Sequence, residues 1–358
     1  MKSLSKVLIR ETPLEILRLV AALLIFLHHA IVHCGVPFDL GPNFASFCVE
    51  FFQRVGKIGV ILYALISGYT LTKSKFTWTK FVTFFLEIFL FTLVLFIFRN
   101  TIEPRTLKKE DFFAIFFPLS FQQYWYITCY AILFVLSPFF NAGLDKLSKK
   151  NHLAITIFFF VLTSVIPQTL NVWNYYTNIF LFFGFYFLGS YFKRYPLGDI
   201  KFWKWIILIL SISLYVGTTL ISTFNKQNEL IMKVLGYVFL DYGDPIYIAC
   251  GLGIFVFVIS LKPFKCKPLN LISFSSLGVY LISDSIYMRD IIFKFGFPSN
   301  QIPYSNYWVL EFLGNNLLRF IIVLAVAFSI KLAYTLTINS QINMLSEFIV
   351  KKGRAKEK

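Results

Sequence analysis

Long apolar runs alternate along the chain with short segments that carry most of the charged residues. An apolar run of about 20 residues is long enough to cross the hydrocarbon layer of a bilayer as a helix. The pattern therefore predicts an all-α, polytopic membrane protein of about ten transmembrane helices. The expected spans are approximately Leu14–Val32, Phe51–Thr72, Phe81–Phe98, Phe112–Phe140, Leu153–Leu170, Tyr175–Phe192, Phe202–Ser222, Pro245–Leu261, Ile272–Phe293 and Leu317–Leu336.

Three segments need separate interpretation. The fourth run is long, and Pro118 within it is expected to mark a kink or an entry segment. The stretch Leu230–Leu240 is too short to cross and is expected to be re-entrant or interfacial. The first run is too long for a signal-peptide core and lacks a small-residue cleavage site, so we expect it to stay as the first span.

The composition changes the picture by excluding other classes. The chain is 57% hydrophobic and 20% aromatic, and only 15% of its residues are charged. A disordered chain is poor in apolar and aromatic residues, and a soluble domain is about one quarter charged. Both classes are therefore excluded in favour of a protein whose main partner is the lipid bilayer.

The net charge of +16 is strongly basic, but its distribution argues against nucleic acid as a partner. With the N-terminus inside, the inside segments carry roughly 21 Lys and Arg residues and the outside segments roughly 7. Basic residues gather in cytoplasmic loops of membrane proteins. The count predicts that both termini are cytoplasmic, with a membrane domain over 1–340 and a basic cytoplasmic tail over 341–358.

Motifs for soluble cofactors and metals are missing. The five cysteines have neither C-x-x-C nor Cys/His spacing, so neither a metal site nor a disulfide framework is expected. The Gly251-Leu-Gly253 segment lies in an apolar span and lacks the third glycine of a dinucleotide loop.

Ionisable residues in the first span are the clearest candidates for chemistry, because such residues are costly inside a membrane. Arg18 and His29 are eleven residues apart, which is about three helical turns or roughly 16 Å along one face. Glu15 precedes Arg18 by three residues and can pair with it. One interpretation is an interfacial ion pair and a helix–helix hydrogen bond. The other is an anion anchor and a catalytic base.

The E-x-x-R and R-x10-H spacings resemble the first span of the integral membrane acyltransferases of the O-antigen acetylase type, acyltransferase family 3. Further segments resemble the motifs of this family in the same order. They are GVILYALISGY at 59–69, YWY at 124–126 with LSP at 136–138, FLGSY at 187–191, YGDP at 242–245, and SSLGVYLISD at 275–284 with Arg289 after it. The last segment resembles the branch common in loci for surface polysaccharides.

The resemblance implies transfer of an acyl group, most often acetyl, from cytoplasmic acyl-CoA to a hydroxyl of an extracytoplasmic glycan. It implies a multi-pass protein of the bacterial plasma membrane, with acyl-CoA as co-substrate and no metal. His29 and Arg18 are then the expected catalytic residues. The expected substrate-binding or supporting residues are Glu15, Ser67, Tyr69, Trp125, Tyr280, Ser283, Asp284 and Arg289.

Two departures from the family pattern are visible. The basic run that often opens the third span is reduced to Lys73, Lys75 and Lys80, which leaves the contacts to the cofactor phosphates open. Ser283 replaces the usual histidine of the ninth span. The role of that histidine does not carry over, although a serine hydroxyl can still form a hydrogen bond.

Several residues also have structural interpretations. Asp284 and Arg289 form either a buried ion pair between helices or a group that orients His29 or the acceptor. Trp125 belongs either to an aromatic belt or to a sugar-stacking surface. Ser67 and Gly68 are expected to permit close helix contact. His28 is expected to pack at the helix surface, and the remaining polar residues His152, Asp241 and Asp244 are expected to be solvated.

Two other functional classes stay open. A transporter or flippase for polysaccharide or lipid-linked sugars would work without acyl-CoA, but the chain has no internal repeat and few acids in mid-span. A structural or sensory membrane protein would tolerate the loss of His29.

Overall fold

The computed structural model describes residues 7–36, 41–104, 109–119, 124–166, 175–238, 242–294, 307–342 and 344, without the side chains of 175–177. Asp241 and almost all of the predicted tail at 341–358 lie outside these residues.

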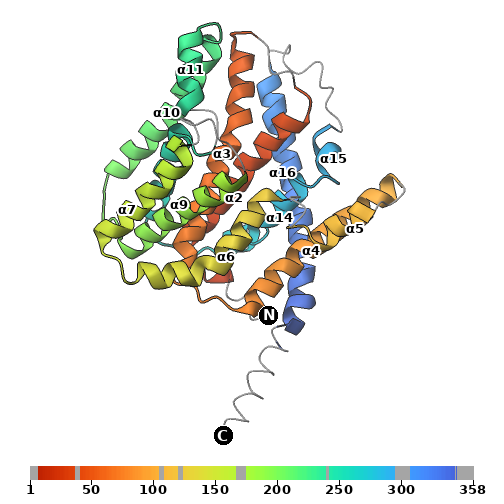
Figure 1. The fold of residues 1–358 in the computed structure, drawn as a ribbon. Helices are drawn as coiled ribbons and strands as arrows, with labels where there is room; N and C mark the ends of the chain where they lie inside the picture. The colour runs from red at the N-terminus through yellow and green to blue at the C-terminus, as the bar shows by residue number, and fades with distance from the viewer. Residues whose placement is uncertain are drawn as a thin grey trace.

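The described residues form α-helices and one π-helical segment, and no β-strand occurs among them (Figure 1). The elements are α2 (Thr12–His33), α3 (Phe44–Leu71), α4 (Trp78–Ile102), α5 (Lys109–Phe116), α6 (Trp125–Leu144), α7 (Lys149–Phe160), η1 (Val161–Val165), α9 (Tyr175–Arg194), α10 (Trp203–Phe224), α11 (Glu229–Val238), α12 (Pro245–Ile259), α13 (Lys267–Ser273), α14 (Ser276–Ser283), α15 (Arg289–Lys294) and α16 (Trp308–Leu336).

Several helices have the length and composition of membrane spans. Within the described part of the chain, five helices are long and apolar enough to cross a bilayer, namely α2, α4, α6, α10 and α16. Large apolar side chains point outward from α10 and α16, among them Leu210 and Ile321, which are 64% and 61% exposed. A surface of this kind suits contact with lipid tails. The fold is thus that of a helical multi-pass membrane protein, whereas ten spans and cytoplasmic termini stay predictions.

Close contacts through glycine build the centre of the bundle from α2, α3 and α9. A Cβ atom on Gly59 of α3 would lie 2.6 Å from the carbonyl oxygen of Ala21 on α2. A Cβ atom on Gly68 would lie 2.5 Å from the carbonyl oxygen of Tyr186 on α9. Only glycine permits backbones to approach so closely. The expectation that Gly68 serves close helix contact is confirmed.

Pro118 interrupts the fourth expected span. Helix α5 ends at Phe116, two residues before this proline, and α6 begins at Trp125. Proline disfavours helical conformation in the residue before it and supplies no amide donor. The structure confirms that Pro118 marks a break, so Phe112–Phe140 is not one continuous helix.

The ninth expected span, Ile272–Phe293, is also wrong as a single helix. Instead, α13, α14 and α15 follow one another with short gaps. At the first gap, the Ser275 hydroxyl donates to the Ile272 carbonyl at 3.0 Å, and at the second the Tyr287 amide donates to the Ser285 hydroxyl at 3.2 Å. Serine side chains compete in this way with the helical backbone bonds. Hydropathy does not register such breaks, because the segment stays apolar throughout.

Two helices begin earlier than their apolar runs. Helix α3 starts at Phe44, and the Asn43 side chain caps it by accepting from the Ser46 amide at 2.8 Å. Helix α16 starts at Trp308 and includes Asn315, whose side chain donates to the Glu311 carbonyl at 2.9 Å. The predicted starts at Phe51 and Leu317 were too late, because polar residues precede the apolar runs and the helices include these residues. The stretch around Leu230 forms the short helix α11.

Two residues expected to be solvated are buried. His152 is 0% exposed, and its Nε2 atom lies 2.9 Å from the carbonyl oxygen of Phe187 on α9. Asp244 is also 0% exposed, directly before α12. Both predictions were wrong because position next to an apolar run does not reveal which neighbouring helix covers a residue. His28 packs as expected, with Nδ1 against the Gln53 carbonyl and its side chain against Gly56.

Candidate active site

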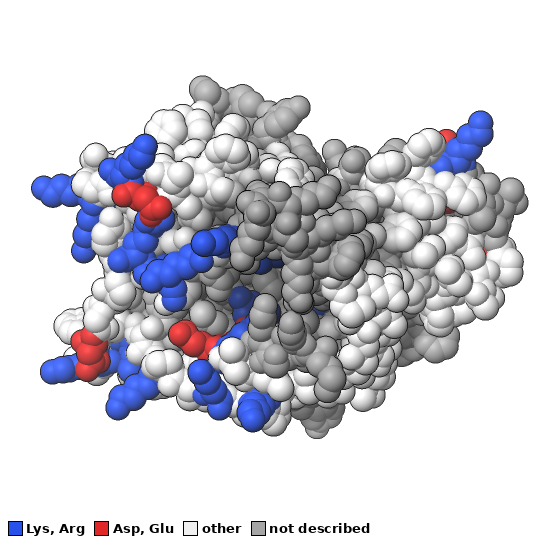
Figure 2. Space-filling view, turned by 90° about the horizontal axis from the view of Figure 1, so that it is seen from below, with Lys and Arg blue, Asp and Glu red and all other residues white. Residues whose placement is uncertain are grey.

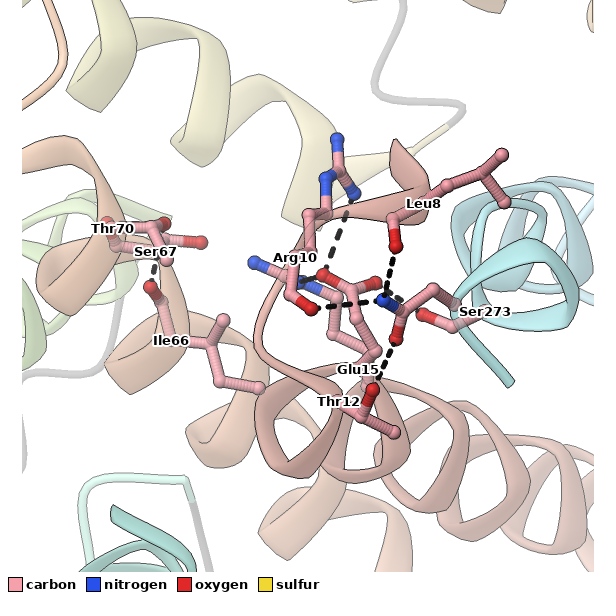
Figure 3. A network of polar contacts seen from close by, with 10 residues as sticks. Leu8, Arg10, Thr12, Glu15, Ile66, Ser67, Thr70 and Ser273 are labelled. Atoms are coloured by element: carbon pink, nitrogen blue, oxygen red, sulfur yellow. Dashed lines mark hydrogen bonds and ion pairs between the residues drawn. The ribbon is translucent and has the colours of Figure 1, made fainter. Parts of the chain in front are cut away.

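Helix α2 carries both Arg18 and His29 and runs through the centre of the bundle. Pro13 stands in its first turn, where a missing amide donor costs nothing. The Thr12 hydroxyl donates to Asn270 Oδ1 at 2.8 Å, and the Asn270 side chain donates to the Arg10 carbonyl at 2.9 Å. These bonds hold the start of α2 against α13 (Figure 3). The two candidate residues are thus held on one rigid element, about 16 Å apart by helical rise.

His29 is buried, with 8% of its surface exposed, and the end of α14 lies against its ring. Ser283 Oγ lies 3.2 Å from His29 Nδ1, which is within hydrogen-bonding distance. Asp284 Oδ1 lies 3.6 Å from His29 Nε2. The structure therefore places a hydroxyl on one ring nitrogen and a carboxylate near the other. The sequence prediction that Ser283 can form a hydrogen bond is confirmed.

Tyr280 completes this group, with its ring centroid 6.3 Å from that of His29. Arg289 begins α15, and a non-helical segment separates it from Asp284. Among the salt bridges of the described residues, Asp284 pairs with His29 and none joins Asp284 to Arg289. Asp284 and Arg289 are thus not in direct salt-bridge contact in this structure, and both interpretations of the two residues stay predictions. The observed contact is the one expected if Asp284 orients the histidine.

Glu15 is the centre of a second polar group, near the start of α2. Its side chain is 1% exposed, and its carboxylate binds the Arg18 guanidinium, as the i,i+3 spacing predicted. Arg10 also reaches Glu15 at 3.5 Å, and the Ser273 hydroxyl donates to it at 2.5 Å (Figure 3). A buried carboxylate needs such partners to offset the loss of water. Glu15 therefore fixes the direction in which Arg18 points.

A cavity of about 570 Å³ opens beside Arg18. Ser67 and Tyr69 of α3 line it, and four basic side chains contribute to its wall, namely Arg10, Arg18, Lys193 and Lys331. The cavity lies where α2 begins and α3 and α9 end, which we call the basic end of the molecule. Viewed from below, this face carries many Lys and Arg and few Asp and Glu side chains (Figure 2). Three carboxylates, Glu11, Glu15 and Glu87, also line the cavity, so its four cations leave a small excess of positive charge.

Lys193, Lys331 and Glu87 are site residues that sequence reasoning missed. Lys331 Nζ lies 2.6 Å from Glu87 Oε1, which joins α16 to α4 inside the cavity wall. Lys193 Nζ lies 4.4 Å from the centre of the Tyr69 ring, a cation–π contact. Glu87 and Lys331 both interrupt apolar helices, so the rule that flagged Arg18 identifies them as well. The same rule does not identify Lys193, because this lysine stands after its apolar run and not inside it.

Two other predicted residues remain to be placed: Trp125 lies outside the cavity lining, and Ser67 lines the cavity but bonds within its own helix. Trp125 starts α6 and packs against the Tyr242 ring at 5.1 Å. The Ser67 hydroxyl faces the cavity and donates to the Tyr63 carbonyl at 2.7 Å within α3. Ser67 and Tyr69 thus belong to the basic end, whereas Tyr280, Ser283 and Asp284 belong to the histidine.

A buried carboxylate, Glu50, pairs with two basic side chains near the start of α3, and this group was not predicted. Glu50 of α3 is 5% exposed and lies 3.0 Å from Lys226 Nζ and 3.4 Å from an Arg54 nitrogen. The Ser222 hydroxyl on α10 donates to Glu50 at 2.9 Å. The pairing explains how the charged Arg54 is accommodated in α3. No cluster of three His, Cys, Asp or Glu side chains suited to a metal occurs among the described residues.

The fold and site define a class: a helical multi-pass membrane protein whose central helix α2 borders a basic cavity and carries a buried histidine, which Ser283 and Asp284 at the end of α14 contact. The model of an acyltransferase domain family, acyltransferase family 3, matches residues 13–336, and the chain therefore belongs to this family. The match covers every element from α2 to α16. No match was found among the curated proteins or among the solved structures.

Proposed function

We propose that the protein is a membrane O-acyltransferase that moves an acyl group, acetyl in particular, from cytoplasmic acyl-CoA to a hydroxyl of an extracytoplasmic polysaccharide or glycolipid. Membership of the acyltransferase family supports the reaction class. The observation that carries the assignment of roles is the placement of a basic cavity and a buried histidine at two depths of one helix.

The cavity at the basic end suits the donor. Acyl-CoA carries several phosphate charges, and four cations from three helices and the segment before α2 line this cavity. Arginine and lysine bind phosphate through charge-assisted hydrogen bonds. Lys331 is already paired with Glu87, so Lys193 is the lysine of the cavity that best replaces the reduced basic run at Lys73, Lys75 and Lys80. The volume of about 570 Å³ is also in the range of about 300–1,000 Å³ that is usual for ligand pockets.

The histidine group suits the chemical step. His29 Nε2 takes the proton of the acceptor hydroxyl as the hydroxyl oxygen forms its bond to the thioester carbon. The carbon–sulfur bond then breaks, the CoA sulfur leaves as a thiolate, and the proton passes from His29 to that sulfur. Ser283 engages Nδ1, so Nε2 is the nitrogen left for the proton, and the Asp284 carboxylate at 3.6 Å stabilises the charged imidazole.

The same residues support an alternative order of steps. In it His29 attacks the thioester first, an acyl-histidine forms, and the acceptor hydroxyl then takes the acyl group. Arg18 holds the donor in both cases, and Glu15 holds Arg18. The two orders differ in whether acyl label stays on the protein when the acceptor is absent.

The test is the O-acyl content of the surface polysaccharide of the host, measured by proton NMR before and after mild base. We would compare the wild type, a deletion strain, and His29→Ala at matched membrane levels. His152→Gln is the matched control, because it removes a buried imidazole on α7 that contacts the Phe187 carbonyl and lies outside the cavity lining.

We expect the deletion and His29→Ala to lose the same ester signal while the polymer still reaches the surface. His152→Gln should keep the signal. A different result supports an exporter or flippase for polysaccharide or lipid-linked sugars: polymer fails to reach the surface in the deletion strain, and His29→Ala behaves as wild type.

A further inference from the structure

A second cavity lies where α10 turns into α11, at the end of the molecule opposite the basic end (Figure 1). Its volume is about 940 Å³. Residues 224–230 form most of its wall, and Gly41 and Pro42, which stand just before α3, complete it. We call it the distal cavity. It was not predicted, because the residues of its wall lie outside the apolar spans.

The wall of the distal cavity is fastened to the bundle. Lys226 Nζ lies 3.0 Å from a carboxylate oxygen of the buried Glu50 and donates to the Ser46 hydroxyl at 3.1 Å. One turn earlier, the Ser222 hydroxyl donates to Glu50 at 2.9 Å. These bonds tie the turn after α10 to the start of α3. A wall that is fixed in advance loses little conformational freedom when a ligand binds.

Three side-chain amides line the distal cavity, those of Asn225, Gln227 and Asn228. The Asn225 amide nitrogen donates to the Ile221 carbonyl at 3.0 Å, and the Asn228 side-chain oxygen accepts from the Ile231 amide at 3.1 Å. Each bond engages one end of its amide, so the Asn225 oxygen and the Asn228 nitrogen can still bond a ligand. Amides both donate and accept hydrogen bonds. Sugar hydroxyls do the same and suit such partners.

The distal cavity also carries an aromatic ring and little net charge. The Phe224 side chain is 51% exposed, and its ring offers an apolar face to the C–H side of a sugar. Among the described lining residues, Lys226 and Glu229 are the charged ones, and their charges have opposite sign. Lys226 is already paired with Glu50. The wall therefore favours an uncharged ligand rich in hydroxyl groups, in contrast to the basic cavity.

The distal cavity lies beyond His29 along the α2–α3 pair. His28, the neighbour of His29, contacts the Gln53 carbonyl of α3. Ser46, which Lys226 binds, stands seven residues before Gln53, or roughly 10 Å by helical rise. One sugar ring is shorter than this separation. A ligand that fills the distal cavity and also reaches His29 therefore consists of several linked sugars.

From these observations, and resting on the proposed acyl transfer, we propose that the distal cavity is a docking subsite for the polysaccharide acceptor. It binds uncharged sugar units that lie further along the chain than the unit that receives the acyl group. A second contact on the same chain raises the effective concentration of the reactive hydroxyl at His29. The subsite therefore makes a long acceptor bind better than a short one, and it acts on KM rather than on kcat.

The test uses the purified full-length protein with acetyl-CoA as donor and acceptors of two lengths. The long acceptor is surface polysaccharide from the deletion strain after mild base has removed its esters. The short acceptors are single repeat units or smaller fragments made from it by partial acid hydrolysis. KM is expressed per repeat unit for both. Calorimetric binding of the long acceptor without CoA is the second readout.

The test variant combines Phe224→Ala with Gln227→Ala, two exposed residues of the cavity wall. Phe202→Ala is the matched control, because this phenylalanine is 61% exposed at the other end of α10 and outside the cavity. If the double variant fails to elute as a folded species in gel filtration, Gln227→Ala alone replaces it.

We expect the double variant to raise KM for the long acceptor by about tenfold, as for the loss of one or two hydrogen bonds, and to weaken its calorimetric binding equally. Its kcat and its KM for the short acceptors should stay at the values of the wild type and of Phe202→Ala. An unchanged KM for the long acceptor would overturn the inference. An equal rise for both lengths would overturn it too, because the residues would then act on the acylated unit itself. Absence of transfer to every acceptor by the wild type would instead overturn the proposed function, whereas calorimetry would still test sugar binding in the cavity.

Discussion

His29 and Asp284 come from opposite parts of the chain, and the carboxylate oxygen of Asp284 lies 3.6 Å from Nε2 of the histidine. The contact exists because α14 ends at Ser283, which turns the next side chain toward α2. A carboxylate beside an imidazole both orients the ring and favours its charged form. This pair links the end of α14 to α2.

Asp284→Asn should lower kcat for acyl transfer by about 10²-fold, the typical cost of misplacing a catalytic group by about an ångström. The KM for acyl-CoA should stay close to that of the wild type, because the donor cavity does not contain Asp284. Steady-state kinetics with purified protein measure both constants. A change in KM alone would mean that Asp284 acts on the donor rather than on the histidine.

His29→Ala should lower kcat by about 10²–10⁴-fold, the usual contribution of a general base. His29→Gln keeps a polar side chain of similar size and should lose nearly as much, since an amide does not take up the proton. The comparison separates chemistry from packing. Wild-type turnover in either variant would contradict the role assigned to His29.

Lys193→Met should raise the KM for acyl-CoA by about tenfold, as expected for the loss of one charge-assisted hydrogen bond. Lys193 lines the donor cavity and lies over the Tyr69 ring. Lys265→Met is the matched control, because this exposed lysine lies between α12 and α13, outside the cavity lining. Equal KM values for the two variants would place the phosphates elsewhere.

Lys331→Met should destabilise the protein by about 3–5 kcal/mol, because it leaves the buried Glu87 carboxylate without its partner. The double variant Glu87→Gln with Lys331→Met should recover most of this loss, since no unpaired charge remains. Thermal unfolding in detergent, followed by gel filtration, shows whether the double variant is more stable than Lys331→Met. A double variant no more stable than Lys331→Met would show that the pair is not energetically coupled.

Gly68→Ala should destabilise the protein by about 1–3 kcal/mol, the usual cost of overpacking, because the new Cβ would lie 2.5 Å from the Tyr186 carbonyl oxygen. Gly217 of α10 is the matched control, since a Cβ there meets nothing within 4 Å. Gly217→Ala should be neutral or stabilise the helix by up to about 1 kcal/mol. Equal unfolding temperatures for the two variants would contradict the close contact of α3 with α9.

The helical class and the polar pairs that lie close together in sequence were predictable. Glu15 and Arg18 are three residues apart, and helical periodicity alone brings them together. His29 and Ser283 meet across 254 residues, and the family resemblance, rather than spacing, indicated that the ninth segment matters. The pair of Glu87 and Lys331 was not predicted, because each charge was visible in its apolar run but nothing in the sequence joined the two.

Breaks in helices were harder to predict than the helices themselves. The break between α5 and α6 was predictable from Pro118, because proline restricts its own backbone and that of the preceding residue. The interruptions after Ser273 and Ser283 depend on serine hydroxyls that bond locally, and the same residues are tolerated inside other helices. The Thr92 hydroxyl, for example, donates to the Ile88 carbonyl within an unbroken α4.

The end of α14 at Ser283 has a further consequence for the charge on His29. The peptide dipoles of a helix add up to partial negative charge at its C-terminus, where the last carbonyls have no partner in the helix. In α14 this pole lies at Ser283, whose side chain contacts the histidine. If the ninth segment were one continuous helix, its negative end would lie beyond His29. Because α14 ends at Ser283, its negative end lies beside the ring that becomes an imidazolium in the proposed reaction. The interruption thus places a dipole end, in addition to the Asp284 carboxylate, beside the base.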